Sequence, residues 1–231
     1  MVESVSVNGQ FSDLLASAAR FQRLVPDAVM VGGSAAAIHS HHRVSFDHDH
    51  VLSDLRDRFE AVLEALEREG GWVTNRITPG KIVLGELGGI ETGLRQLIRR
   101  TPLETEVYRL PDGNGITIPT RAETLRVKAF LTVKRNQVRD YLDVAALAVT
   151  MGIERAGQVL AGIDAFYADQ APAEGTVAAQ VAAQLADPRP KDSRTTARLS
   201  AYKGLARRWH DWGQVKLVCR AVAAAMLTAK L

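Results

Sequence analysis

The segment between residues 29 and 51 constrains the fold of this chain more than any other part. An apolar run at 29–31 leads into Gly32-Gly33-Ser34, and small residues over 34–40 favour a short helix. Glycine has no Cβ, so the backbone of such a turn can adopt positive φ and come close to phosphate oxygens. The pattern predicts a strand, a glycine turn and a helix whose N-terminus can hold an anion.

The strand expected next, over residues 43–52, carries Asp47 and Asp49. Side chains alternate between the faces of a strand, so both carboxylates are expected on one face with backbones roughly 7 Å apart. Two carboxylates at this spacing can share divalent cations, which neutralise a triphosphate and align an attacking oxygen. We therefore expect a site for an NTP and for Mg²⁺ or Mn²⁺, with Asp47 and Asp49 as the metal ligands.

The composition is that of an ordinary folded protein. The chain has 231 residues, which is long enough for one large or two small domains. Of these residues 46% are hydrophobic and 24% are charged. The single cysteine, Cys219, lies in an apolar stretch and cannot form an internal disulfide. This cysteine content fits a reducing compartment. The chain shows neither a secretory signal nor an apolar run long enough for a membrane span. We expect a cytoplasmic protein without a membrane partner.

Hydrophobic periodicity separates a mixed α and β part from a helical part. The expected fold class is α+β, with a mixed β-sheet flanked by helices over residues 1–119 and an all-helical domain over 120–231. In the first part, helices are expected at 11–24 and 55–69, and strands at 72–77, 81–87, 90–94, 104–110 and 116–118. In the second part, helices are expected from 120 to about 150 with a break near 135–137, at 159–167, at 177–185, and from 192 onward.

A second polar cluster lies in the predicted helix after residue 120. On an uninterrupted helix, Lys128, Arg135, Arg139 and Asp143 fall within roughly 80° of one another. This stripe could face the carboxylates across one cleft and neutralise triphosphate oxygens. Alternatively it is a solvated face, with Arg139 and Asp143 as an ordinary i,i+4 pair. Its occurrence together with the aspartate strand favours the first interpretation.

Three segments, Gly32-Gly33-Ser34, Ser45-Phe46-Asp47-His48-Asp49 and residues 128–143, together resemble the nucleotidyltransferase toxins of the AbiEii/MenT type. These toxins belong to the DNA polymerase β-like nucleotidyltransferase superfamily, and the resemblance covers about residues 29–150. It implies transfer of a nucleoside monophosphate from an NTP to an acceptor, in the better understood branch the 3′ end of tRNA. Growth arrest or phage defence would follow, and a cognate antitoxin is a possible partner.

The resemblance also implies roles for individual residues. The helical domain would complete the active site and contact the acceptor. Asp140 would support the site, and the third carboxylate of the metal site would be Glu91 or Glu106. Catalytic roles fall on Asp47, Lys128 and Asp143, metal binding on Asp47 and Asp49, and nucleotide binding on Gly33, Ser34, Ser45, Lys128 and Arg139.

Two rival functions remain open. Five histidines, His39, His41, His42, His48 and His50, lie within twelve positions, and histidine with aspartate suits a metal-dependent phosphohydrolase. Strand alternation, however, directs His48 and His50 away from the aspartates, and the other three are expected to complement carbonyls at a helix end. The second rival is a module that binds a nucleotide or a partner protein without turnover. The presence of both aspartates, Lys128 and Asp143 argues against it.

The segment from Asp187 to His210 is strongly basic. It has seven lysines and arginines, at positions 189, 191, 194, 198, 203, 207 and 208, and two aspartates. Such a segment can contact the phosphate backbone of an RNA, and it can equally be a solvated face. Trp209 and Trp212 could stack on bases, but their i,i+3 spacing favours packing.

Overall fold

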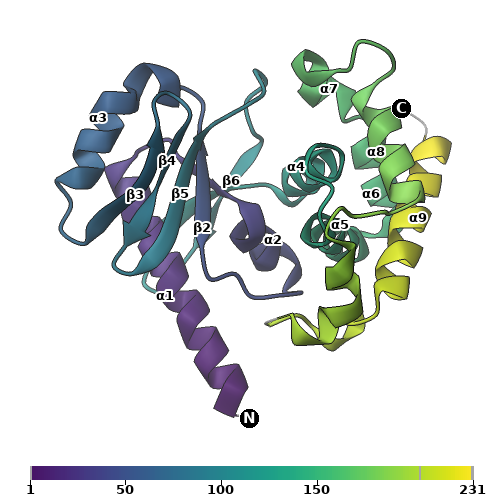
Figure 1. Ribbon diagram of the computed structural model, residues 1–231, viewed down its shortest axis with the longest axis horizontal. Coiled ribbons are helices and arrows are strands. Elements are labelled where there is room, and N and C mark those ends of the chain that lie inside the picture. The colour runs from purple at the N-terminus through teal and green to yellow at the C-terminus, as the bar shows by residue number, and fades with distance from the viewer. Residues whose placement is uncertain (1, 203, 230–231) are drawn as a thin grey trace. The chain divides into compact units, whose positions relative to one another are not determined.

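The computed structural model describes residues 2–202 and 204–229 (Figure 1), which form two compact units. Unit 1 contains the residues up to Ala35 together with Val44–Thr120, and unit 2 contains Ala36–Arg43 together with the residues from Arg121 onward. The division expected at residue 119 placed 36–43 in the first part. The structure places this segment with the helices, since Ala36 lies in their hydrophobic core.

Unit 1 contains a mixed five-stranded sheet in the order β1-β2-β5-β4-β3. Strands β2 and β5 are parallel, and the other neighbours are antiparallel. This confirms the predicted fold class. The elements of the sheet and its helices are α1 (Val2–Leu24), β1 (Val29–Val31), α2 (Gly32–Ser40), β2 (His48–Leu52), α3 (Leu55–Glu67), β3 (Trp72–Thr78), β4 (Ile82–Leu87) and β5 (Ile90–Gln96). A separate antiparallel pair consists of β6 (Thr105–Arg109) and β7 (Gly115–Pro119).

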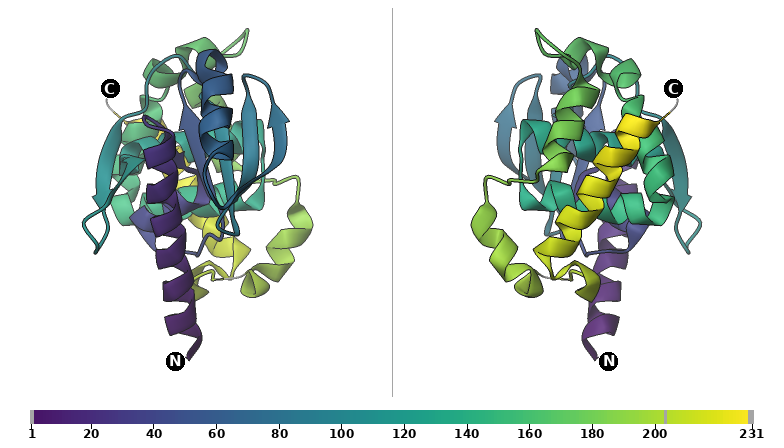
Figure 2. Two further views of the ribbon diagram at one scale, coloured as in Figure 1. Left: turned by 90° about the vertical axis from the view of Figure 1, so that its left-hand side faces the viewer. Right: turned by 90° about the vertical axis from the view of Figure 1, so that its right-hand side faces the viewer.

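Helices α1 and α3 cover one face of this sheet, and both face the viewer in the left view of Figure 2. Their apolar residues, among them Phe21 and Phe59, pack on Val83, Leu87 and Leu94 of the strands. The helix expected over 55–69 forms because its apolar residues recur at helical spacing, so that a single stripe is buried. The opposite face of the sheet carries Asp49 of β2 and Glu91 and Arg95 of β5.

Strand β2 is shorter than the sequence pattern predicted. The expected strand over 43–52 begins only at His48. Strand β1 has three residues and pairs only with residues 49–51 of β2, and the chain then turns into α2 at Gly32. Residues before His48 therefore have no β1 neighbour, and the segment from 41 to 47 is irregular. Asp47 lies in this segment, one residue before the strand.

Unit 2 is built from helices, as expected. Its elements are α4 (Arg121–Lys134), α5 (Val138–Met151), α6 (Ile153–Ala161), α7 (Asp164–Tyr167), η1 (Ala168–Gln170), α8 (Val177–Ala186), η2 (Ser193–Ala201), η3 (Arg207–Trp209) and α9 (Trp212–Thr228), where η marks 3₁₀ helix. The predicted break near 135–137 is confirmed. Asn136 has a φ of 54° there, and its carbonyl accepts a hydrogen bond from the amide of Lys191.

Two helix predictions in unit 2 are wrong. The helix expected at 159–167 is divided, because the chain turns at Gly162 between α6 and α7. In place of the expected continuous α-helix from 192 onward, Ser193–Ala201 and Arg207–Trp209 form 3₁₀ helices, the first with a kink at Arg198. Local periodicity resembles that of an α-helix in both places, but tertiary packing decides the path.

Helix α5 forms the centre of the unit 2 core and is buried along most of its length. Helix α9, yellow in the right view of Figure 2, packs against it and against α6 and α8. Trp209 is buried and the Trp212 ring meets that of Tyr141 edge to face, so the packing interpretation of the two tryptophans is confirmed. In the described part of the chain, no single helix could cross a membrane. The pair α5 and α6 is apolar and long enough together, but it bends by 117°.

His48 and His50 lie on the helix-covered face of the unit 1 sheet, both with 0% exposure. His48 Nδ1 lies 3.0 Å from His50 Nε2, and its Nε2 lies 3.1 Å from Ser17 Oγ. Burial lowers the pKa of His48 to about 4, although the Asp47 charge opposes this shift. Burial, and next the neighbouring His48, lower the pKa of His50 well below its ordinary value. Both rings are therefore held neutral in the folded protein.

Acidification is expected to destabilise the folded chain. Because the unfolded chain binds protons at these histidines near pH 6.5 and the folded chain does not, stability is lost as the pH falls from about 6.5 toward about 4. The slope should approach about 1.4 kcal/mol per pH unit for each histidine. Urea denaturation at pH 7, 6 and 5 measures it. The variant His48→Asn/His50→Asn should show a flatter dependence and His41→Asn, at an exposed position, an unchanged one. A wild-type stability that is constant over this range would contradict the assignment.

Candidate functional site

The glycine turn and the first aspartate of unit 1 form one hydrogen-bonded group. Ser34 in the first turn of α2 donates from its hydroxyl to the carbonyl of Asp47 at 2.6 Å. Ser45 donates to Oδ1 of Asp47 at 2.8 Å. Both serines are buried, while Asp47 is exposed. The two hydroxyls thus hold the backbone and the carboxylate of Asp47, next to the N-terminus of a helix that begins at Gly32 and Gly33.

Asp49 lies on the sheet face opposite His48 and His50, as strand alternation predicted. Two glycines keep the space around the Asp49 carboxylate open. A Cβ on Gly93 would lie 2.4 Å from Asp49 Oδ1, and one on Gly32 would lie 3.3 Å from Oδ2. Gly32 also has a φ of 76°, which disfavours any larger residue. Arg95 of β5 approaches Asp49 at 3.9 Å.

The sheet topology separates the two candidates for a third carboxylate. In the parallel pair of β2 and β5, Asp49 lies beside Gly93, so Glu91, two residues earlier, shares the face of Asp49. The same register continued by one residue places Glu91 beside Asp47. Glu106 belongs to β6, which is part of the separate two-stranded pair. Among these two residues, the structure favours Glu91.

The donor chemistry around Asp47 and Asp49 fits a hard cation. Among the described residues, no three His, Cys, Asp or Glu side chains gather closely enough to hold a metal by themselves. Mg²⁺ is commonly held by one or two carboxylates, with water and substrate phosphates completing its shell. A two-carboxylate site with space left by two glycines meets that requirement. The buried histidines, on the other face, cannot join Asp49 in the mixed ligand set that a histidine-dependent phosphohydrolase would use.

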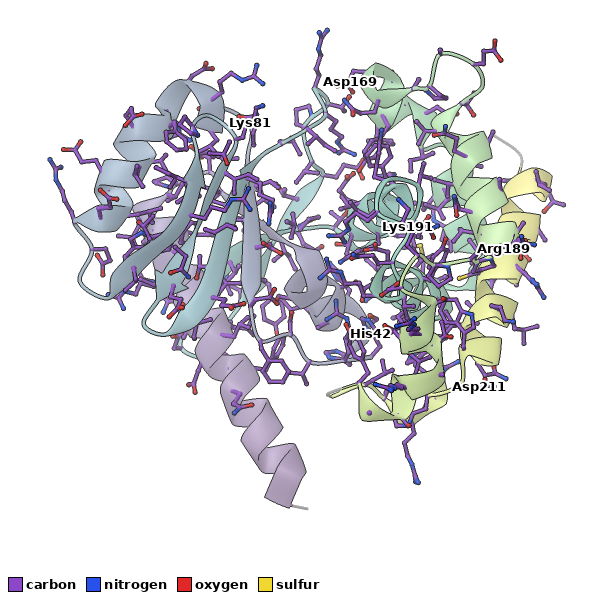
Figure 3. All side chains as sticks on the ribbon, viewed as in Figure 1. His42, Lys81, Asp169, Arg189, Lys191 and Asp211 are labelled. Carbon is purple, nitrogen blue, oxygen red and sulfur yellow. The ribbon has the colours of Figure 1, made fainter. Side chains whose placement is uncertain are left out.

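In unit 2, Lys128 and Asp143 form the centre of a buried charge cluster. Lys128 Nζ lies 2.7 Å from Asp143 Oδ2. Arg43 donates from Nε to Oδ1 at 2.8 Å and from Nη2 to Oδ2 at 3.1 Å. His42 Nε2 lies 2.7 Å from Oδ1, and Figure 3 labels this histidine. The exposed fraction of the side chain is 0% for Asp143, 2% for Lys128 and 8% for Arg43.

These neighbours keep Asp143 ionised. Burial by itself raises the pKa of a carboxyl group, but the charges of Arg43 and Lys128 and the hydrogen bond from His42 outweigh it. The pKa of Asp143 is therefore held well below its ordinary value. Burial lowers the pKa of His42, which favours the neutral ring. A neutral ring with its proton on Nε2 donates to Asp143. Its Nδ1 lies 2.8 Å from the Ser40 hydroxyl, which donates to the carbonyl of Ala36 at 2.7 Å.

The single polar stripe expected on one helix is wrong. The chain breaks between α4 and α5, so Lys128 and Asp143 meet because the two helices pack together. Arg139 is exposed and does not pair with Asp143. Arg135 instead binds Asp140, which is fully buried. The two carboxylates of α5 thus have separate cationic partners. The shared cleft with Asp47 and Asp49 stays a prediction.

Sequence reasoning missed three residues around these two groups. His42 and Arg43 bind Asp143, whereas His42 was expected to complement a helix end, and that expectation is wrong. No local pattern could reveal a contact across about one hundred positions. Gly93 could have been noticed, because a glycine within a strand pattern often marks the close approach of another group.

Most of the basic segment after Asp187 is exposed in unit 2. We call its exposed cations, Arg189, Lys191, Arg194, Arg198, Arg207 and Arg208, the basic surface. Figure 3 labels the first two. Arg189 pairs with Asp187 at 2.6 Å, and the Arg208 guanidinium lies 4.8 Å from the centre of the Trp209 ring. Lys203 lies outside the described residues.

Loss of the Asp143 carboxylate should strongly destabilise the protein. Asp143→Ala leaves the buried Lys128 and Arg43 charges without their counter-ion, which costs about 3–5 kcal/mol in comparable buried pairs. Urea denaturation followed by circular dichroism measures the loss. The matched control is Asp187→Ala, which breaks the exposed pair with Arg189 and should cost less than about 1 kcal/mol. Equal losses in the two variants would contradict the role of burial.

Comparisons with known proteins give two kinds of similarity. No family model matches the sequence. The heme uptake protein MmpL11 of Mycobacterium tuberculosis H37Rv is 34% identical over 242 aligned residues, which cover 93% of this chain and 22% of that protein. The mycolic acid-containing lipids exporter MmpL11 of Mycolicibacterium smegmatis is 40% identical over 129 residues, 56% of this chain and 13% of that protein. The chain thus spans about a fifth, or less, of the length of the curated relatives it matches.

Among solved structures, MenT4, a nucleotidyltransferase toxin from Mycobacterium tuberculosis H37Rv, superposes with a TM-score of 0.61. The superposition covers 95% of this chain and 84% of MenT4, at 15% sequence identity. Similarity at this level of identity concerns the fold. The resemblance to nucleotidyltransferase toxins is confirmed at that level, and this chain has the nucleotidyltransferase fold.

Proposed function

We propose that this chain is a metal-dependent nucleotidyltransferase that transfers a nucleoside monophosphate from an NTP to the 3′ end of an RNA, with tRNA as the first acceptor to test. By analogy with MenT4, which is described as a toxin, the activity would arrest growth in the cytoplasm until an antitoxin neutralises it.

One observation carries the proposal. The Gly32-Gly33-Ser34 turn and Asp47 are joined by the Ser34 hydroxyl at 2.6 Å, and Gly32 packs beside the carboxylate of Asp49. The N-terminus of α2 offers backbone N–H groups to phosphate oxygens. Unit 1 therefore presents an anion-binding helix end beside two carboxylates, which is the combination that a metal-bound triphosphate requires.

Different residues of unit 1 would have different roles in the transfer. Asp47 and Asp49 would hold Mg²⁺ or Mn²⁺, which when bound supplies charge neutralisation for the triphosphate. Ser34 and Ser45 hold Asp47 in position, and Gly33 leaves the backbone open to phosphate. A hydroxyl oxygen of the acceptor forms a bond to the α-phosphorus, the bond from that phosphorus to the bridging oxygen breaks, and pyrophosphate leaves. The hydroxyl proton passes to solvent or to a carboxylate.

Lys128 and Arg139 differ in their exposure, and therefore in their access to a substrate phosphate. Lys128 is 2% exposed and bound to Asp143, so contact with a triphosphate requires an opened conformation of its surroundings. Arg139 is exposed at the start of α5, so its guanidinium is open to contact with an anion. The basic surface of unit 2 supplies several exposed cations for the phosphate backbone of the acceptor RNA.

A second candidate function is a module that binds a nucleotide or a partner without turnover. The curated relatives are transport proteins in which a matching segment makes up about a fifth of the length. A nucleotide-binding unit in such a setting could serve regulation instead of group transfer. The burial of Lys128 and Asp143 in the described conformation also agrees with a binding role.

Incubation with Mg²⁺, labelled NTPs and total RNA tests these functions. Label in RNA supports transfer, phosphate release without labelled RNA supports a phosphohydrolase, and neither outcome supports binding alone. Asp47→Ala should reduce transfer to the level of a reaction without protein, because a ligand of the cation is lost, while circular dichroism stays unchanged. Glu60→Ala, at an exposed position on α3, is the control and should retain wild-type transfer. Near wild-type transfer by Asp47→Ala would disprove the assignment.

RNA binding tests the role of the basic surface. Arg207→Glu/Arg208→Glu should weaken binding and reduce the slope of log K against log salt by about 0.7–0.9 for each RNA phosphate that the variant no longer neutralises. The control Arg121→Glu/Arg155→Glu makes the same charge change at two exposed positions on α4 and α6. Filter binding from 50 to 200 mM salt measures both quantities. An unchanged slope in the first variant would remove η3 from the RNA contact.

A further inference from the structure

The four donor contacts of Asp143 fill the acceptor positions of its carboxylate. Oδ1 accepts from Arg43 Nε and His42 Nε2, and Oδ2 lies against Lys128 Nζ and Arg43 Nη2. An ionised carboxylate has about four acceptor positions. The four contacts occupy them, and the side chain is fully buried. The resemblance implied a catalytic role for Asp143, but a carboxylate so occupied is poorly placed to accept a proton from an acceptor hydroxyl.

Two of these donors come from a short connecting segment. His42 and Arg43 lie between the end of α2 and the start of β2. Within unit 2 the same segment has two further contacts. The amide of Ala206 donates to the carbonyl of His42 at 2.8 Å, and the amide of His41 continues the pattern of α2 by donating to the carbonyl of Ala37 at 2.9 Å. Residues 41–43 have no strand neighbour, so these contacts determine their conformation.

This connecting segment leads directly to the candidate metal ligands. Its neighbours in sequence are the helix that begins at Gly32 and, four residues after Arg43, the exposed Asp47. A segment without regular structure would sample many conformations, at a cost of about 1–2 kcal/mol for each residue that is fixed. Ion pairs to one buried carboxylate remove that freedom before any substrate binds.

We infer that Asp143 is a positioning residue that clamps residues 41–43 through His42 and Arg43, and so restricts the segment that carries Asp47. This clamp consists of Asp143, His42, Arg43 and Lys128. Its role in transfer rests on the function proposed above, whereas the clamp itself does not. Asp143 acts on the reaction through the conformation of the chain, and Lys128 completes the neutralisation of its charge.

Limited proteolysis tests the clamp directly. Trypsin cleaves after Arg43, and the rate of that cleavage under native conditions reports how often residues 41–45 open. Asp143→Asn should raise this rate by about tenfold or more. The matched control is Asp140→Asn, which removes the other buried carboxylate of α5, bound to Arg135, and should leave the rate unchanged. Mass spectrometry of the fragment that ends at Arg43 identifies the cleavage.

A milder variant covers the case in which Asp143→Asn does not fold. His42→Ala removes one donor but retains Arg43, Lys128 and the trypsin site. It should raise cleavage after Arg43 severalfold, and Thr176→Ala, which removes the side-chain cap of α8, should not. Cleavage of His42→Ala at the wild-type rate, or equal rates for folded Asp143→Asn and Asp140→Asn, would overturn the inference.

Transfer assays separate positioning from proton acceptance. Positioning predicts that His42→Ala and Asp143→Asn both lower transfer and raise the Mg²⁺ concentration needed for half-maximal rate, with pH–rate profiles parallel to the wild type. The positioning role would be overturned in favour of proton acceptance by two results together: full transfer by His42→Ala, and loss of the acid limb of the pH–rate profile in Asp143→Asn. If the wild-type chain transfers no nucleotide, the proposed function fails, and the proteolysis rates still decide whether the clamp exists.

Discussion

A carboxylate that loses its water on burial must be neutralised by the protein, and at Asp143 this requirement organises much of unit 2. The cations and the imidazole that satisfy it come from positions 42, 43 and 128. Two of these partners lie about one hundred residues away along the chain. Breaking such a pair is costly because the remaining charge stays buried. The cluster therefore explains why residues 36–43, which follow the glycine turn in sequence, belong with the helices.

The sheet of unit 1 separates two kinds of chemistry by strand alternation. One face of β2 directs His48 and His50 into an apolar core, where burial keeps them neutral. The other face carries Asp49, beside glycines that leave its carboxylate accessible. In this short strand His48 and His50 thus contribute to the buried core, while Asp49 on the other face belongs to a candidate metal site. The acid sensitivity of the fold and the affinity for a cation should accordingly respond to different substitutions.

The structural similarity and the sequence similarity are to two different kinds of protein. The structural similarity is to a toxin made mostly of this fold, and the sequence similarity is to about a fifth of a transport protein. Both are compatible with a unit that binds a nucleotide, because the glycine turn and the aspartates are local to unit 1. The proposed transfer demands more, since an acceptor must also bind.

The sequence by itself determined the features that depend on near neighbours. Alternation separated Asp49 from His48, periodicity located α3 and α5, and the glycine turn before small residues predicted the short helix α2 that begins there. Tertiary structure alone decided which partners Asp143 has, because His42 and Arg43 reach it from a distant segment. It also decided that Lys128 and Asp143 lie on two helices instead of one stripe, and that Glu91, and not Glu106, shares the face of Asp49. Local spacing encodes periodicity, whereas the pairing of buried charges depends on how separate elements pack.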